Sequence, residues 1–270
     1  SISCPMSVNK SNEYQSLLNY WDGNGSQPSS ESVINTLYQL TEDLKLENCT
    51  YQKDVIDAMF RQVYSNETNP FDTIPNIPGR IFATKYDMGI VGQAYQDNIV
   101  SDFHVTTGVY TAWNNGWMYR NDGVDISECN DIYIFHNGYH VGWFESGEWL
   151  QYTVNIESDA VYDIKLRYAT ANPGSKLHFA NEDQFISPSK EATSNNNWTV
   201  WQTLTFENII LESGIQKLRL YCDNGEVNVN SFEIIEKSEI SSIDANYLNA
   251  TTLNPKNIEL LLNKPISSPI

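Results

Sequence analysis

The chain has 270 residues, of which 34 are acidic and 16 are basic, and it carries a formal net charge of −18 at pH 7. This excess of negative charge argues against a nucleic-acid or anionic-membrane partner, because either would need a cationic face. No apolar run is long enough to span a bilayer, and the sequence begins without the layout of a signal peptide. We therefore expect a soluble piece of a longer, secreted protein.

Residues 1–69 have a helical pattern. One apolar stripe runs through residues 31–47 behind a cap at Ser30, and a second follows Thr50; their members are Val33, Leu37, Leu40 and Leu44, then Val55, Met59 and Val63. These helices have too little apolar surface to form a domain alone. They either pack against the following domain or form the tail of a preceding catalytic domain.

Residues 70–77 are predicted to be a linker, within a proline-rich stretch at 66–78. From Arg80 onward the pattern is entirely β. Strands are expected at 80–86, 148–156, 161–169, 176–180, 200–211, 216–222 and 227–236. Many short strands without intervening helices predict an all-β fold over 78–236, a jelly-roll β-sandwich of two antiparallel sheets. Alternation then stops, and residues 237–270 are predicted to be a linker and the start of a further module.

The four cysteines are even in number and fall in no metal-like pairs, so they allow up to two disulfides. Pairing within each region would join Cys4 to Cys49 and Cys129 to Cys222.

The most informative stretch is 138–154, where two tryptophans stand among glycines and alternating strand residues. Trp143 lies between Gly142 and Phe144 in a glycine-bounded corner, where a sharp turn can leave the ring at the rim of a loop. Such a ring can stack on the C–H face of a sugar. Trp198 follows a polar loop, which also favours an exposed ring.

Six segments, at 77–89, 92–97, 119–126, 142–150, 198–201 and 228–232, follow one another in an order that resembles the family 6 carbohydrate-binding modules. The resemblance covers about 77–236. It implies a jelly-roll sandwich that binds a plant or algal polysaccharide such as a β-glucan, xylan or agar-type chain. It also implies that the module is monomeric, does no chemistry itself and targets a covalently linked glycoside hydrolase to that polysaccharide.

The resemblance also implies the binding residues. A sugar ring would lie between Trp143 and Trp198, while the amide of Asn228 and the carboxylate of Asp125 would bond its hydroxyl groups. Trp149 and Trp201 are interpreted as packing residues, and a second groove beside Trp149 on the concave sheet face stays open as an alternative.

Two other pairs of polar residues have spacings that resemble those of catalytic or metal-binding pairs. Glu145 and Glu148 match positions of the family's non-catalytic motif, so a glycosidase pair is not expected. His136 and His140 are interpreted as solvated loop residues.

A structural calcium ion held by the first and last strands is common in the family. Here Phe82 and Thr84 stand where acidic or amide side chains are usual, which removes hard oxygen ligands. A cation could still settle among Asp87, Asp97, Asp122 and backbone carbonyls.

Two other function classes remain. The fragment could retain part of a glycoside hydrolase activity, in which case it would release reducing sugar, or it could be a protein-interaction sandwich that binds no glycan.

Overall fold

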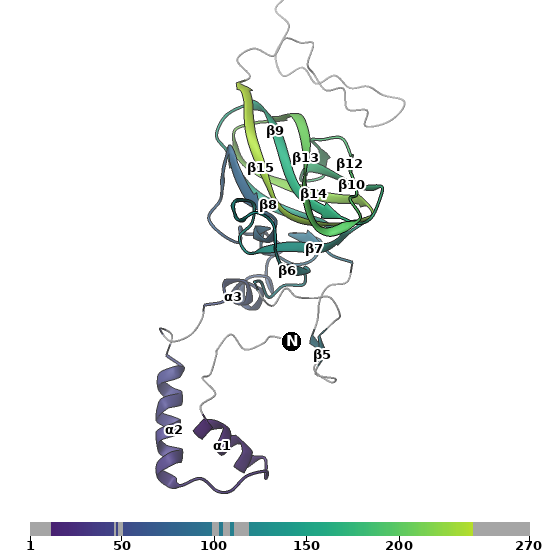
Figure 1. The fold of residues 1–270 in the computed structure, drawn as a ribbon. Helices are drawn as coiled ribbons and strands as arrows, with labels where there is room; N and C mark the ends of the chain where they lie inside the picture. Colours follow the sequence, from purple (N-terminus) through teal and green to yellow (C-terminus); the bar gives the residue numbers. More distant parts are fainter. Residues whose placement is uncertain are drawn as a thin grey trace, which may run out of the picture.

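The computed structural model describes residues 12–45, 47, 51–98, 103–104, 109–110 and 119–239. Two β-sheets pack against each other, and three helices precede them in the chain (Figure 1). The expected sandwich is therefore confirmed. Cys4, Cys49 and nearly all of the segment predicted to be a linker and a further module lie outside the described residues.

The first sheet has seven strands in the order β1-β8-β14-β10-β11, and β12 and β3 pair with β10 and β8. Its strands are β1 (Asn76–Ile77), β3 (Tyr95–Gln96), β8 (Trp149–Ile156), β10 (Ser175–Asn181), β11 (Gln184–Phe185), β12 (Lys190–Ala192) and β14 (Gly214–Asn224). All of its pairings are antiparallel except that of β1 with β8.

The second sheet has six strands in the order β13-β9-β15-β7-β6, and β2 also pairs with β15. Its strands are β2 (Gly79–Phe82), β6 (Ile126–Glu128), β7 (Tyr139–Glu145), β9 (Ala160–Thr170), β13 (Asn197–Leu211) and β15 (Glu226–Glu239). A separate short pair consists of β4 (Phe103–His104) and β5 (Val109–Tyr110). Short 3-10 turns occupy Ala83–Lys85 and Tyr133–Phe135.

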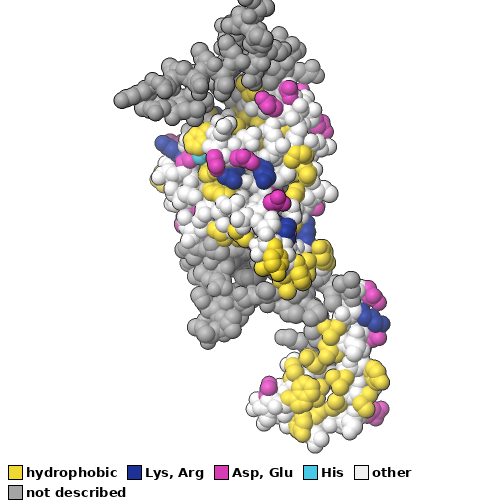
Figure 2. Space-filling view, turned by 180° about the vertical axis from the view of Figure 1, so that it is seen from behind, with side chains coloured by type: hydrophobic (Ala, Val, Ile, Leu, Met, Phe, Trp, Pro, Cys, Tyr) yellow, Lys and Arg dark blue, Asp and Glu magenta, His cyan; other side chains and the backbone are white. Residues whose placement is uncertain are grey.

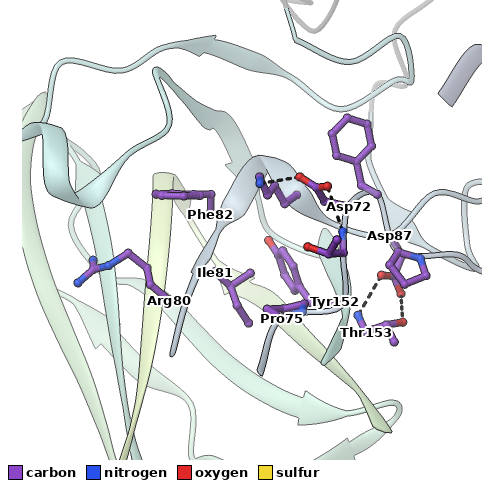
Figure 3. A pocket seen from close by; sticks show the side chains of 12 residues that line it. Asp72, Pro75, Arg80, Ile81, Phe82, Asp87, Tyr152 and Thr153 are labelled. Carbon is purple, nitrogen blue, oxygen red and sulfur yellow. Dashed lines mark hydrogen bonds and ion pairs between the residues drawn. The ribbon is translucent and has the colours of Figure 1, made fainter. Parts of the chain in front are cut away.

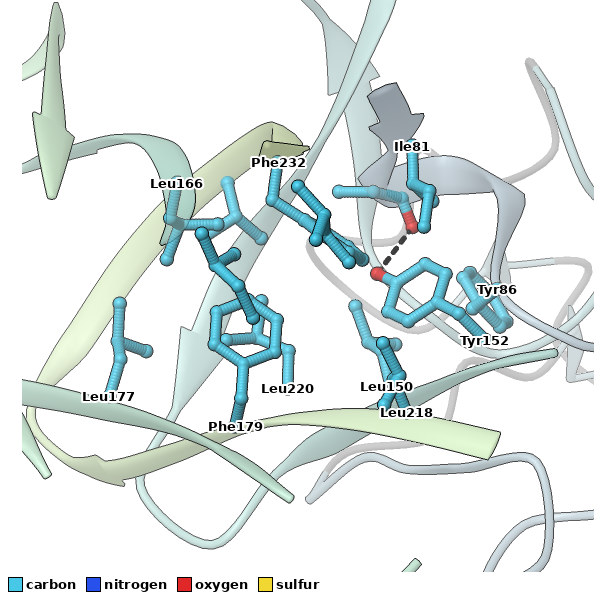
Figure 4. Close-up of a cluster of buried hydrophobic side chains, with 14 of the residues drawn as sticks. Ile81, Tyr86, Leu150, Tyr152, Leu166, Leu177, Phe179, Leu218, Leu220 and Phe232 are labelled. Carbon is cyan, nitrogen blue, oxygen red and sulfur yellow. Dashed lines mark hydrogen bonds between the residues drawn. The ribbon is translucent and has the colours of Figure 1, made fainter. Parts of the chain in front are cut away.

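The core lies between the two sheets and is built from the inward-facing residues of both (Figure 4). Phe232 of β15 is fully buried, and its ring contacts Phe179 of β10 and Tyr152 of β8 across the sandwich at centroid distances of 5.1 and 5.0 Å. The Tyr152 hydroxyl donates to the carbonyl of Ala83 at 2.9 Å, so its one polar atom is satisfied. On β9, the alternating residues Tyr162, Ile164, Leu166 and Tyr168 are buried.

The helices are α1 (Asn12–Trp21), α2 (Ser30–Asp43) and α3 (Lys53–Phe60). Ser29, one residue before the expected cap, caps α2 by accepting a bond from the Ser32 N–H at 3.1 Å. Apolar side chains of α1 and α2 gather on the surface of this helical part (Figure 2), among them Trp21, Ile34 and Tyr38. In the part of the chain that the structure describes, no helix is long and apolar enough to cross a membrane.

Helix α3 is hydrogen-bonded to the sandwich. The buried carboxylate of Asp54 accepts from the backbone N–H of Asn121 at 2.6 Å, and Arg61 donates to the carbonyl of Met88 at 3.2 Å. This part of the predicted helical segment is therefore attached to the strands that follow it.

The expected link between Cys129 and Cys222 is wrong, because both are free thiols. Cys222 lies in β14 of the first sheet, whereas Cys129 follows β6 at the edge of the second sheet.

Candidate functional site

A β-bulge in the second sheet positions Trp143. The pairs Phe144 with Val227 and Val141 with Val229 leave Gly142 and Trp143 opposite the single residue Asn228. Bulges of this kind bend a strand and redirect a side chain, and they are frequent beside binding sites. Trp143 is thus a residue of β7, whereas the sequence placed it in a loop.

The backbone of Trp143 is strained. Its φ of 45° is one that a bulky L-residue rarely adopts, at a cost on the order of 1–3 kcal/mol. The side chain is half-buried and does not belong to the core between the sheets. A strained backbone that holds a large ring at the surface indicates that the position of the ring is needed for function.

At most strand positions an alanine variant is more stable than a glycine variant, but the strained φ of Trp143 reverses this order. We expect the Trp143→Gly variant to be more stable than Trp143→Ala by about 1 kcal/mol, because only glycine adopts this φ without penalty. Urea unfolding of the two variants measures the difference. Thr205 has an ordinary strand φ, so there the alanine variant should be more stable than the glycine variant. If the glycine variant were the more stable one at both positions, or the alanine variant at both, the account would be contradicted.

Trp198 lies in a second, larger bulge. The pairs Asn197 with Thr170 and Gln202 with Tyr168 leave four residues, 198–201, opposite one residue of β9. Oδ1 of Asn197 accepts bonds from the backbone N–H and the hydroxyl of Thr199 at 2.8 and 2.9 Å, which fixes the start of this segment. The Trp198 side chain is half-buried and also lies outside the core.

Asn228 joins the two bulges. Its Nδ2 donates to the carbonyl of Trp198 at 2.9 Å, and its Oδ1 is 3.4 Å from the place where a Cβ on Gly142 would be. One amide therefore holds the backbone of one tryptophan and borders the residue before the other. The absence of a side chain at Gly142 leaves space beside this amide.

Asp125 completes the group, since its carbonyl accepts from the Gly142 N–H at 3.0 Å. Its buried Oδ1 makes no hydrogen bond within the described protein. Burial raises the pKa of this carboxyl to about 8, and the nearby charges of Asp97 and Glu145 act in the same direction. The backbones of Asp125, Trp143 and Trp198 are thus linked through Gly142 and Asn228, and the binding of a sugar by their side chains stays a prediction.

These acids make the stability of the protein depend on pH. The carboxyl of Asp125 has a pKa of about 8 when folded and about 3.9 when unfolded, so the folded chain holds the proton more tightly. The stability from this proton is complete below pH 4 and is lost as pH rises through 8. Burial gives Glu148 the same trend, with a pKa of about 8. We expect the melting temperature to fall by several degrees between pH 5 and pH 9.

The Asp125→Asn variant should flatten this profile, whereas substitution of the 86 % exposed Asp183 by Asn should leave it unchanged. A melting temperature that stays constant or rises over this pH range would contradict the assignment.

One residue near the site, His140, has an environment that the sequence did not predict. His140 is not a solvated loop residue; it lies in β7, is 8 % exposed, and burial lowers its pKa to about 4. Its Nε2 is 3.5 Å from the Cβ position of Gly142, and its ring meets the edge of Trp201 at 5.3 Å. Trp201 is half-buried and donates from Nε1 to Asn130 at 2.8 Å. Trp201 was expected to pack, and its contact with the ring of His140 agrees with that expectation.

The two glutamates near Trp143 differ in environment. Glu148 is 5 % exposed, and its two carboxylate oxygens accept bonds from the backbone N–H groups of Asn98 and Glu145 at 2.9 and 2.8 Å. This arrangement fixes the turn between β7 and β8. The Glu148 carboxylate therefore serves the backbone and does not face Glu145 across an open cleft.

Trp149 is half-buried on the first sheet. The guanidinium of Arg219 lies 4.2 Å from its ring centroid, and the ring of Tyr221 packs beside it at 6.0 Å. Arg219 is in turn bound to Asp183 at 2.6 Å. These contacts agree with a packing role and place Trp149 on a different sheet from Trp143.

The positions where the family resemblance places calcium ligands do not fit the ion. Phe82 offers no ligand atom, and Oγ1 of Thr84 accepts a bond from Nδ2 of Asn137 at 3.0 Å. Asp87 is bonded to Thr153, whose N–H and hydroxyl donate to it at 2.9 and 2.8 Å. Among the described residues, no three His, Cys, Asp or Glu side chains are grouped as metal ligands.

A small pocket of about 140 Å³ is lined by the segment before β1 and by residues of β2 and β8 (Figure 3). Its lining includes Asp72, Phe82, Asp87 and Thr153. Asp72 is paired with Lys85 at 2.7 Å, and Asp87 with Thr153. Because these charged groups already have partners within the protein, the pocket has fewer polar groups available to bond sugar hydroxyls than the site around Trp143 and Trp198.

One family model matches part of this chain. Residues 117–236 match the carbohydrate binding module (family 6). A carbohydrate binding module from Cellvibrio mixtus lichenase 5A, solved with cellotriose, is 25 % identical with a TM-score of 0.39; the match covers 43 % of this chain and 88 % of that one. A β-1,3-glucan binding module from Bacillus halodurans is 21 % identical with a TM-score of 0.42, over 60 % of this chain and 98 % of that one.

Among curated proteins, a 1,6-α-glucosyltransferase of Sporosarcina globispora is 25 % identical over 166 residues. The match covers 59 % of this chain but only 12 % of that protein. With the sandwich and the gathered site residues, the family match gives the assignment: residues 117–236 of this chain are a family 6 carbohydrate binding module.

Proposed function

We propose that the site formed by Trp143, Trp198, Asn228 and Asp125 binds a plant or algal polysaccharide, such as a β-glucan, xylan or agar-type chain, and that the module does no chemistry itself. One observation supports this most strongly. Asn228 bonds the backbone of Trp198 and borders Gly142, so two surface tryptophans share one polar group. The site of this proposal is called the tryptophan cleft below.

Each group has a separate physical role. The indole rings stack on the C–H faces of a sugar, and we take stacking of a base on an aromatic ring, about 1–3 kcal/mol, as the scale. Oδ1 of Asn228 and the Asp125 carboxyl bond hydroxyl groups and select their orientation. At neutral pH the carboxyl of Asp125 is mostly protonated, so it can donate as well as accept. Two rings and a few solvent-competing bonds give a Kd on the order of 10–1000 μM.

In the intact protein, the module would hold a linked catalytic domain on its polysaccharide outside the cell. The glucosyltransferase relative supports a link of this kind, and its name adds α-1,6-glucans to the ligands that need testing. The exposed apolar side chains of α1 and α2 support the proposal that the N-terminal segment belongs with a preceding catalytic domain. A further module after residue 237 is proposed on sequence alone.

An affinity gel tests the proposal. The chain is run through gels that contain barley β-glucan, laminarin, xylan, agarose or dextran, with serum albumin as the non-binding standard. Retardation by at least one gel is expected, together with no reducing-sugar release from any of them. Release of reducing sugar would overturn the non-catalytic assignment, and failure to bind any glycan would overturn the function and favour a protein-interaction sandwich.

A further inference from the structure

Among the described residues, Arg120 is a charged residue that is fully buried. It is 0 % exposed and ranks first in volume among the fully buried side chains. A guanidinium has five N–H donors in a fixed plane, and burying it is costly unless each donor has an acceptor. The environment of Arg120 therefore has to supply five contacts.

Oxygen atoms from two segments supply all five. Nη1 donates to the carbonyls of Thr84, at 3.3 Å, and Tyr86, while Nη2 donates to the carbonyl of Asp87 at 3.2 Å. The Asp122 carboxylate takes the remaining two, from Nε at 2.9 Å and from Nη2 at 2.5 Å. We call the three carbonyls and the Asp122 carboxylate the oxygen cage.

Two aromatic rings also contact the guanidinium. The guanidinium carbon lies 3.5 Å from the ring centroid of Tyr86 and 4.2 Å from that of Phe71. Cation–π contacts of this kind are strongest where water is excluded. The Tyr86 hydroxyl also donates to the second oxygen of Asp122, which holds the carboxylate in place.

The cage has the chemistry of a site for a hard cation. Backbone carbonyls and a carboxylate are the ligand types that calcium takes in proteins. Carbonyls that converge in a buried turn need a positive partner, because each would otherwise lose its hydrogen bonds to water. The planar fork of the guanidinium supplies this charge and directs one N–H to each carbonyl and two to one oxygen of Asp122.

We propose that Arg120 is the built-in cation of this module, and that its guanidinium takes the place of a structural calcium ion in holding the turn at residues 84–87 against the Asp122 segment. The fold therefore needs no divalent metal at this place. No oxygen of the cage is free to coordinate calcium. Each already accepts a hydrogen bond, from the guanidinium or, for the second oxygen of Asp122, from the Tyr86 hydroxyl. Phe71, which lies outside the matched residues 117–236, contacts the guanidinium, and Asp54 of helix α3 bonds the backbone of Asn121 beside the cage.

The first experiment uses the unaltered chain. Its thermal unfolding is recorded in 5 mM EDTA and in 5 mM calcium chloride at constant ionic strength, and calcium binding is followed by isothermal titration calorimetry. We expect the same melting temperature in both solutions and no saturable binding heat. A melting temperature that rises with calcium in a saturable manner, at one ion per chain, would overturn the proposal.

Variants test the role of the guanidinium itself. Arg120→Lys keeps the charge but offers three donors for five contacts, so its melting temperature should fall by roughly 10 °C, the shift expected when a buried ion pair is broken. The matched control is Arg80→Lys, which should change the melting temperature little, because Arg80 is 21 % exposed and its partner Glu233 is 37 % exposed. Equal, small effects at the two positions would overturn the proposal.

Rescue completes the test if Arg120→Lys folds poorly. In the Arg120→Ala variant, 20 mM guanidinium chloride should raise the melting temperature relative to 20 mM sodium chloride, because the free ion can enter the vacated cage. The same salt should not stabilise the unaltered chain. Rescue by calcium alone, with none by guanidinium, would show that the cage is a metal site and would overturn the proposal.

Discussion

Replacing Trp198 by alanine will weaken polysaccharide binding by a factor of about 5–150 and reduce retardation in an affinity gel accordingly. The ring supplies about 1–3 kcal/mol of stacking, which corresponds to a factor of about 5–150 in Kd. Its backbone is held by Asn228, so the loss of the ring should leave the bulge in place. Isothermal titration with the oligosaccharide of the best ligand measures the change.

The matched control for Trp198 is Val200→Ala. Val200 lies in the same bulge and is 50 % exposed, but it has no ring to stack on a sugar. It should bind as the unaltered chain does. If Trp198→Ala kept its affinity while its fold, checked by circular dichroism, was unchanged, the tryptophan cleft would not be the binding site.

Replacing Phe232 by alanine will destabilise the sandwich by about 3–5 kcal/mol, as is usual for a large ring removed from a packed core. Phe232 is fully buried and contacts rings from two strands of the opposite sheet (Figure 4). The cavity left between Phe179 and Tyr152 cannot be filled by small movements of either strand. Urea unfolding at pH 6 gives the change in the free energy of unfolding.

The comparison for Phe232 is Phe185→Ala, because Phe185 is 62 % exposed at the edge of the first sheet. Its loss should cost less than about 1 kcal/mol. A small effect at Phe232 would mean that the two sheets do not share one packed core.

The strands were largely predictable because one face of each is buried. The expected strands at 148–156 and 161–169 are β8 and β9 to within one residue at each end, since alternation sets both the strand and its face. Strand β7 was missed because Gly138 and Gly142 resemble turn residues. In the fold, Gly142 leaves space beside Asn228, a reason that no single-sequence pattern reveals.

The candidate site was predictable in part. The resemblance to a family selected Trp143, Trp198, Asn228 and Asp125. The structure links the backbones of the two tryptophans and Asp125 through Gly142 and Asn228. The positive φ of Trp143 could not be foreseen, because it depends on the register of β7 and β15.

The position of Arg120 is a further example of a contact that the sequence does not show. Its partners lie 33 to 36 residues earlier in the chain, apart from the nearby Asp122. The sequence did suggest that a cation could settle near Asp87, Asp122 and backbone carbonyls. The structure shows a side chain of the protein there.

A crystal structure with the oligosaccharide that binds best tests the central claim most directly. We expect a pyranose ring in the tryptophan cleft, with Trp143 and Trp198 against its faces and the Asn228 amide bonded to its hydroxyl groups. A sugar bound elsewhere, for example over Trp149 and Tyr221 on the other sheet, with the tryptophan cleft empty, would contradict the account.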